Sequence, residues 1–203
     1  MRYTGPKARL CRRLGVNVFG TEKYTKILSR RNVKPGMHAG KKSMGKTSEY
    51  GKQLLEKQKA RIVFGISEKQ FHNYFKKAAK ETGETGENLL RFLERRLDNV
   101  VYVSQFAVTR MQSRQMVNHG HFLLNGHPVD VPSLLVSPGD KLELTPQLKD
   151  SPLYRDLAEL KDYAPKWLKV DLAKGIIEVL ALPAKDDLEK SIESQLIVEY
   201  YSR

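Results

Sequence analysis

The sequence predicts an α+β protein in which a basic arm and a helical subdomain precede a small α/β domain. Three observations support this prediction. Residues 1–61 carry a one-sided positive charge, and residues 48–92 repeat apolar side chains at helical spacing. Residues 93–182 combine amphipathic helices with short apolar strands and tight turns, which predicts two helices packed on a short antiparallel, partly hairpin sheet.

The same patterns set the expected boundaries. We expect a basic arm over residues 1–46 and a helical subdomain over 47–92. An α/β domain should follow over 93–182, with its core motif in 93–156. The last segment, 183–203, is expected to pack on the helical subdomain.

The charge of the chain is concentrated at its beginning. Residues 1–61 hold 17 Lys and Arg against 3 Asp and Glu, a net charge of +14, so the remaining residues carry a net charge of −1. Such a block is typical of a segment that lies against a polyanion. Residues 31–52 contain four glycines and no broad apolar face, which favours nucleic acid over a membrane surface. A solvated tail remains the alternative for a charge run taken alone.

Other classes of protein are disfavoured by composition. The chain contains no run of about 18–20 apolar residues, as a membrane span requires, and its N-terminus lacks the apolar stretch of a secretory signal. The single cysteine, Cys11, excludes an intramolecular disulfide and fits a reducing compartment. We therefore expect a cytoplasmic protein.

Capping residues and glycines delimit the expected helices. Short helices are predicted over Lys7–Leu14 and 23–30, and a long one from Thr47 or Ser48 to Gly65. The next helix should open with a capping box formed by Ser67 and Gln70 and present an apolar face that includes Phe71. Thr85 should cap a third helix that continues to Leu97.

The α/β domain is predicted from its turns. A helix capped by Thr109 should stop at Gly120, before a strand over Phe122–Leu124. Asn125-Gly126 predicts a two-residue hairpin turn into a partner strand over 128–131. Further strands are expected over 141–145, 167–172 and 176–180, and helices over 151–163 and around Leu188. The β-branched segment at 197–201 is expected to be extended.

Arg110 and Arg114 lie four residues apart and therefore on one face of the helix that follows Thr109. Arg95 and Arg96 end the preceding helix. If the two helices pack side by side, these four arginines converge at a helix N-terminus and form an anion site. A surface helix with scattered charges is the alternative.

Residues 113–144, SRQMVNHGHFLLNGHPVDVPSLLVSPGDKLEL, resemble the small RNA-binding domain named after the fourth small-subunit ribosomal protein. That domain also occurs in pseudouridine synthases, tyrosyl-tRNA synthetases and heat-shock RNA-binding proteins. The remaining resemblance is to the ribosomal family itself, of bacterial or organellar type. It rests on RYTGPKARLCRRLG at 2–15, GISEKQF at 65–71, ERRLDNVVY at 94–102 and EYYSR at 199–203.

The resemblance implies a structural component of the small ribosomal subunit. Such a protein binds a junction in the 5′ domain of small-subunit rRNA and nucleates assembly of the body of the subunit. It contacts the fifth small-subunit protein and other small-subunit proteins, lies near the site where mRNA enters and contributes to translational accuracy. The location would be the cytoplasmic ribosome, or an organellar stroma or matrix if the chain is organelle-encoded. A stand-alone RNA chaperone or RNA-modifying factor is the alternative.

Carried over residue by residue, the resemblance assigns RNA contacts to the arm, to the arginine helix and, more weakly, to two residues at the end of that helix. To these we add the basic residues of the long helix and the arginine pair before the second domain. The complete expected set is Arg2, Tyr3, Lys7, Arg9, Arg12, Arg13, Lys34, Lys41, Lys42, Lys46, Lys52, Lys57, Lys59, Arg61, Arg95, Arg96, Arg110, Arg114, Asn118 and His119.

Neither a cofactor nor a metal is expected. Many members of the family bind zinc through four N-terminal cysteines, whereas this chain has Cys11 alone, with Ala8 where a second would stand. A tetrahedral structural zinc site needs four ligands, so we expect the zinc-free form. His119, His121 and His127 lack accompanying ligands at recognised spacing. No nucleotide-binding loop or nucleophile motif is present, so no enzyme activity is expected.

Overall fold

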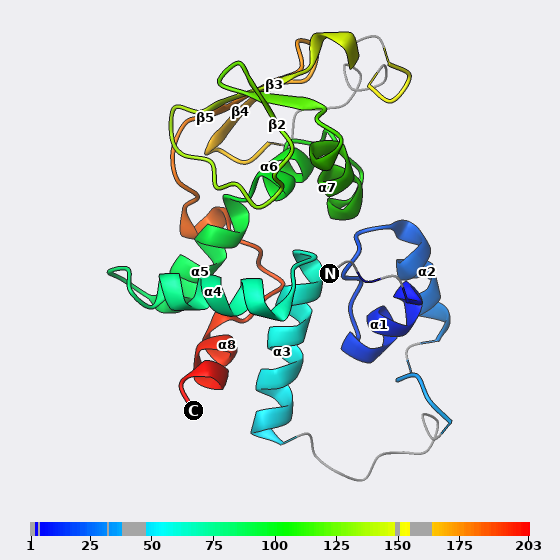
Figure 1. Cartoon of the computed structure of the whole chain (residues 1–203). Helices are drawn as coiled ribbons and strands as arrows, with labels where there is room; N and C mark the ends of the chain where they lie inside the picture. Colours follow the sequence, from blue (N-terminus) through cyan, green and yellow to red (C-terminus); the bar gives the residue numbers. More distant parts are fainter. Residues whose placement is uncertain (1–2, 4, 32, 38–47, 149–150, 155–163) are drawn as a thin grey trace. The chain divides into compact units, whose positions relative to one another are not determined.

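The structure is a computed structural model that describes residues 3, 5–31, 33–37, 48–148, 151–154 and 164–203 (Figure 1). The chain divides into two compact units. The first comprises Met1–Gly86 together with Lys190–Arg203, and the second comprises Glu87–Glu189. In the described part of the chain, every helix is too short or too polar to cross a membrane.

Two short helices follow the N-terminus, as predicted. Helix α1 spans Lys7–Leu14 and α2 spans Glu22–Arg30, and the two pack against each other. Gly15 ends α1 with a φ of 74°, a left-handed conformation that glycine adopts without the steric cost of a Cβ. Cys11 and Val18 are buried in this small helical pair, which therefore has a minimal apolar core.

Helices α3 (Glu49–Val63) and α4 (Glu68–Ala78) begin at the predicted caps. The Ser48 hydroxyl accepts from the Gly51 backbone N–H at 3.2 Å. Ser67 and Gln70 form the predicted capping box, in which each side chain accepts from the other residue's backbone N–H. Phe71 and Tyr74 are buried on the predicted apolar face of α4.

The C-terminal segment departs from the prediction. Residues 197–201 were expected to be extended, whereas Ser194–Tyr201 form helix α8, which packs along α3 (Figure 1). Ile197 is fully buried. Tyr201 is one helical turn later and places its ring 4.5 Å from that of Phe75 on α4. Burial of one helical face thus outweighs the strand preference of β-branched residues.

The helix expected to run from Thr85 to Leu97 is also divided. Helix α5 spans Thr85–Glu94, and α6 begins anew at Leu97 and ends at Val103. Arg96 between them has extended dihedral angles, φ −65° and ψ 137°, and forms an isolated antiparallel bridge with Leu135. The Asn99 side chain donates to the Glu94 carbonyl oxygen at 3.1 Å, so it satisfies a group that the interruption of the helix exposes.

Helix α7 (Arg110–Asn118) has the predicted cap, with the Thr109 hydroxyl accepting from the Gln112 N–H at 3.2 Å. Five strands follow in an antiparallel sheet of order β2-β1-β3-β5-β4. They are β1 (Phe122–Leu124), β2 (His127–Val129), β3 (Lys141–Leu144), β4 (Leu168–Asp171) and β5 (Ile176–Val179). Strand β2 lies at an edge of the sheet, where Pro128, which has no N–H, is tolerated.

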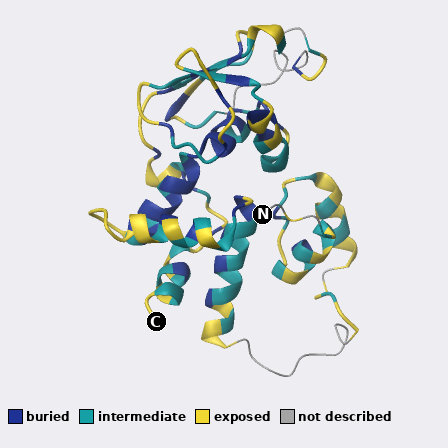
Figure 2. Ribbon diagram, viewed as in Figure 1, coloured by how far each residue is buried: buried dark blue, intermediate teal, exposed yellow. Residues whose placement is uncertain are grey.

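The core of the second unit lies between the sheet and two helices. Side chains of α6 and α7, among them Val100 and Val117, pack against the inward-facing Phe122, Leu142 and Ile177 of the sheet. Figure 2 shows buried residues gathered where α6 and α7 meet the strands. The predicted α+β class, with two helices packed on a short antiparallel sheet, is confirmed.

Two shorter segments complete the described chain. Pro146–Leu148 and Lys185–Asp187 form single 3₁₀ turns, η1 and η3, so the helix expected around Leu188 is only a 3₁₀ turn that ends before it. Of the helix expected over 151–163, residues 151–154 form turns and bends, and residues 155–163 lie outside the described part.

Candidate nucleic-acid interface

The basic residues of α1 divide into exposed and bonded groups. Arg9 and Arg13 are exposed and lie four residues apart on one face of the helix. Arg12 instead donates from Nε to the Val33 carbonyl oxygen at 2.9 Å. Lys7 places its Nζ 5.5 Å from the centre of the Phe19 ring. The exposed face of α1 is therefore carried by Arg9 and Arg13, whereas Arg12 anchors the segment that leads into the arm.

Cys11 does not fit a metal site. Its side chain is fully buried, and burial raises the pKa of its thiol above the ordinary value, which disfavours the thiolate that zinc requires. His38, the other soft ligand near it in sequence, lies outside the described residues. Among the residues that the structure describes, no group of three or more His, Cys, Asp or Glu side chains is arranged to hold a metal ion.

The basic residues of α3 are paired with acidic neighbours. Lys57 is buried and donates from Nζ to Glu68 Oε1 at 2.7 Å. It also lies 4.6 Å from the centre of the Tyr200 ring. The enclosed ammonium group of Lys57 therefore disfavours the RNA contact that was expected of it, and that contact stays a prediction.

Three other basic side chains of α3 also form ion pairs. Lys59 pairs with Glu56 at 3.0 Å, and Arg61 approaches Glu68 at 3.5 Å. Lys52, which pairs with Glu49, is the most exposed of the set, with 53 % of its side chain accessible. Of the four expected contacts on α3, Lys52 is therefore the best placed to meet an external anion.

The structure also disfavours the expected RNA contact of Arg96. Its side chain is fully buried, and it binds Asp98 through two bonds, Nε to Oδ1 at 3.0 Å and Nη2 to Oδ2 at 2.7 Å. A guanidinium in this position has no access to an external phosphate. Arg95 is half-buried and donates from Nε to the Val136 carbonyl oxygen at 2.9 Å, which ties the end of α5 to the loop before β3.

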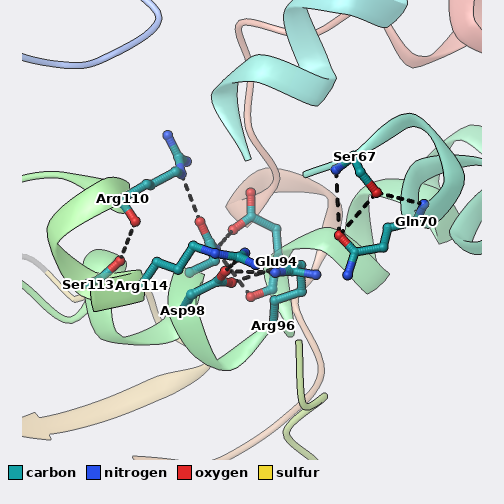
Figure 3. A network of polar contacts seen from close by, with 9 residues as sticks. Ser67, Gln70, Glu94, Arg96, Asp98, Arg110, Ser113 and Arg114 are labelled. Carbon is teal, nitrogen blue, oxygen red and sulfur yellow. Dashed lines mark hydrogen bonds and ion pairs between the residues drawn. The ribbon is translucent and has the colours of Figure 1, made fainter. Parts of the chain in front are cut away.

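The arginines of α7 meet carboxylates of the same unit. Arg114 Nη1 lies 2.9 Å from Asp98 Oδ2, so Arg96 and Arg114 share one carboxylate. Arg110 donates from Nη2 to Glu189 Oε2 at 2.7 Å. Figure 3 shows the side chains of Arg96, Asp98 and Arg114 gathered at one place. Of the four arginines expected to converge, Arg96 and Arg114 share Asp98, whereas Arg110 meets Glu189 and Arg95 a backbone carbonyl oxygen. The anions that the first three meet are internal carboxylates.

Glu94 lies beside this cluster. Its Oε2 accepts from Asn99 Nδ2 at 2.6 Å. Burial raises the pKa of Glu94 to about 7, although the nearby positive charge of Arg110 opposes the rise. Burial therefore favours the protonated form of this carboxyl group, which lies beside the arginines.

The C-terminal end of α7 presents an exposed polar surface. Asn118 and His119 are exposed at the end of the helix, and Gly120 turns the chain with a φ of 69°. His121 is half-buried, with its Nδ1 2.7 Å from the Tyr154 hydroxyl. Burial, together with the neighbouring His119, lowers the pKa of His121, which favours the neutral imidazole.

The expected contacts therefore fall into four groups. Arg2, Lys41, Lys42 and Lys46 lie outside the described residues. The exposed members are Tyr3, Arg9, Arg13, Lys34, Lys52, Asn118 and His119. Those of intermediate exposure are Lys7, Arg12, Lys59, Arg61, Arg95, Arg110 and Arg114. The buried ones are Lys57 and Arg96.

The acidic partners of these arginines, Asp98 and Glu189, were not predicted from the sequence. Asp98 and Asn99 are buried polar residues inside the apolar run 97–101 of α6. Polar side chains at such positions require buried partners, so their place in the sequence could have indicated a buried polar contact. Glu189 is distant in sequence from Arg110, so no local pattern indicates that pair.

A chain with a concentrated basic N-terminal segment and a small α/β unit that carries two arginines on one helix has the organisation of a nucleic-acid-binding protein. Residues 2–94 match the family model described as the ribosomal protein S4/S9 N-terminal domain, and residues 95–142 match the S4 domain.

Curated relatives extend the match to the whole chain. A "Small ribosomal subunit protein uS4" of Pelotomaculum thermopropionicum is 47 % identical over 209 residues, covering 100 % of this chain and 99 % of the relative. Proteins with the same name from Syntrophomonas wolfei and Chloroflexus aurantiacus are 48 % and 44 % identical, with the same coverage. The chain belongs to the uS4 family of small-subunit ribosomal proteins, which confirms the expected family. This is a family of ribosomal proteins and not of enzymes.

Proposed function

We propose that the chain is a structural constituent of the small ribosomal subunit and binds small-subunit rRNA as an early step in assembly of the body of the subunit. The match over the whole chain to relatives named as small-subunit proteins carries this proposal. The net charge of +14 in residues 1–61 supports it, because phosphate neutralisation supplies much of the affinity for RNA.

The exposed basic residues supply the first contact surface. On α1, Arg9 and Arg13 project from one exposed face, and Arg12 holds the segment at Val33 against that helix. We assign residues 1–46 to the RNA-binding arm, which includes Lys34, Lys41, Lys42 and Lys46. We assign residues 47–92 to the helical subdomain and residues 183–203 to a segment that packs on it.

The second contact surface belongs to the α/β domain, assigned to 93–182. A-form RNA hides base edges in its deep major groove, so proteins recognise helical junctions by shape and by backbone and 2′-hydroxyl contacts. The exposed end of α7, with Asn118 and His119, offers side-chain donors and acceptors for such contacts. The target that this proposal assigns is the multi-helix junction of the 5′ domain.

We assign the protein partners from the family. The fifth small-subunit protein is the proposed neighbour of the C-terminal segment, near the site where mRNA enters, and that contact is the proposed source of an effect on translational accuracy. The proposed location is the cytoplasmic ribosome, or an organellar stroma or matrix if the chain is organelle-encoded.

The test compares binding of the purified chain to small-subunit rRNA and to large-subunit rRNA across a series of salt concentrations. We expect tight binding to the small-subunit rRNA and at least about a thousandfold weaker binding to the other, as for specific against non-specific nucleic-acid complexes. Equal affinity for both RNAs would contradict a subunit-specific role and favour a general RNA chaperone.

A further inference from the structure

The two arginines of α7, Arg110 and Arg114, belong to two groups of contacts with different surroundings. Arg110 contacts Glu189, Asn99 and Tyr102. Arg114 contacts Asp98, which also binds Arg96. Arg110 and Arg114 lie one turn apart on α7. Their contacts, however, predict different roles for the two side chains.

The side chain of Arg110 is enclosed by its contacts. The guanidinium Nε donates to Asn99 Oδ1 at 2.9 Å, and Nη2 donates to Glu189 Oε2 at 2.7 Å. Its Cζ lies 4.5 Å from the centre of the Tyr102 ring, and only 19 % of the side chain is exposed. A guanidinium that is stacked on one face and bonded to an amide and a carboxylate is committed to the fold.

The side chain of Arg114 is more exposed to solvent than that of Arg110. The side chain is 30 % exposed, and its Nη1 bonds Asp98 Oδ2 at 2.9 Å. Asp98 is also bound at both oxygens by Arg96, which is fully buried. One carboxylate shared by two guanidiniums compensates each of them less than a carboxylate that faces a single one. Part of the positive charge of Arg114 therefore stays uncompensated, on a side chain that is still partly exposed.

Asp98 is itself fixed in place. Its backbone N–H donates to the Pro132 carbonyl oxygen at 3.2 Å, and the preceding Leu97 N–H donates to the Leu134 carbonyl oxygen at 2.8 Å. The carboxylate is therefore held by both its backbone and Arg96. A side chain bonded to such a group loses less conformational freedom when it binds a ligand, because it is already ordered.

From this geometry we infer that Arg114 binds an RNA phosphate and that Asp98 is its positioning residue, whereas Arg110 is a structural residue. The inference rests on the proposed function and deepens it, because it separates two arginines that sequence spacing makes equivalent. Arg96 supports the arrangement from inside by holding both oxygens of Asp98.

The first experiment measures the affinity of the full chain for small-subunit rRNA as a function of salt. Arg114→Ala is expected to weaken binding about tenfold and to reduce the slope of log affinity against log salt by about 0.7–0.9, the value of one phosphate contact. Arg110→Gln should leave the slope unchanged and lower the thermal stability. Lys169→Gln removes an equal charge from an exposed side chain on β4, and it should change neither the salt slope nor the thermal stability. An unchanged slope in Arg114→Ala would overturn the inference.

A double-mutant cycle tests the role of Asp98. Asp98→Asn should weaken RNA binding in the wild-type background and have no further effect when Arg114 is already alanine. Equal effects of Asp98→Asn in both backgrounds would show that Asp98 acts only through the fold. If circular dichroism shows that Asp98→Asn is unfolded, Asp98→Glu, which keeps the charge but displaces it, takes its place in the same cycle. A wild-type chain that does not bind the rRNA would contradict the proposed function itself.

Discussion

Asn99 Nδ2 lies 2.6 Å from Glu94 Oε2, in a buried site where the pKa of the Glu94 carboxyl is about 7. Asn99 also accepts from Arg110 through its Oδ1, so one amide connects the carboxyl group to the arginine helix. The protonation state of Glu94 is therefore coupled to the packing of α6 against α7.

The first prediction concerns pH. Because folding raises the pKa of Glu94 from 4.5 to about 7, its contribution to stability is fully present below about pH 4.5 and is lost as the pH rises through about 7. Over that window the loss is at most about 3 kcal/mol in the free energy of unfolding. Glu94→Gln should flatten the pH dependence of urea unfolding between pH 5 and 8.

The control for this prediction is Glu81→Gln, since Glu81 is exposed in the loop after α4. It should keep the pH profile of the wild type. A Glu94→Gln variant with the wild-type profile would show that another group controls the pH dependence.

The second prediction separates anchoring from RNA contact on α1. Arg12→Ala removes the bonds to the carbonyl oxygens of Val33 and Lys34, at 2.9 Å and 3.5 Å, so the amides of Val33, Lys34, Gly36 and Met37 should exchange their hydrogens faster. Arg13→Ala changes the net charge equally but removes an exposed side chain. It should weaken RNA binding without changing the exchange. Identical exchange in the two variants would contradict the anchoring role.

The third prediction concerns the turn between β1 and β2. Asn125 has a φ of 51°, and its side chain donates to Asp140 and accepts from the Lys141 N–H, both at 2.9 Å. Asn125→Gly keeps the backbone conformation but loses both bonds, and Asn125→Ala also adds strain. We expect costs of about 1 kcal/mol and about 2 kcal/mol, respectively, in chemical unfolding. Equal stability of the two variants would show that the backbone conformation contributes nothing.

The fourth prediction tests whether Lys57 is structural. Lys57→Met removes the bond to Glu68 from a buried position, and we expect a loss of about 1–2 kcal/mol in stability with an unchanged salt slope of RNA binding. Lys52→Met, on the exposed side of α3, should reduce the salt slope of RNA binding and leave the stability unchanged. A reduced slope for Lys57→Met at wild-type stability would instead show that Lys57 contacts RNA.

The fold could be predicted where local chemistry decides it. The caps at Ser67 and Thr109 and the turn at Asn125-Gly126 depend on hydrogen bonds and dihedral angles within a few residues, and all were found. The helical state of 197–201 depends instead on burial of Ile197 against other elements. Strand propensity carries no information about that burial.

The candidate site was predicted in its residue types but not in their roles. Spacing places Arg110 and Arg114 on one face of α7, and they do lie there. It does not reveal that Arg96 is buried on Asp98, because the interruption of the helix depends on the bridge to Leu135. Counting basic residues therefore overestimates the surface available to RNA.

The most direct test of the central claim is sedimentation of the chain with small ribosomal subunits. If it is a structural constituent, it should migrate with the small subunit through a high-salt gradient at about one copy per subunit, because buried rRNA contacts are screened less than exposed ones. Recovery of the chain only in the free fraction at the top of the gradient would contradict the account.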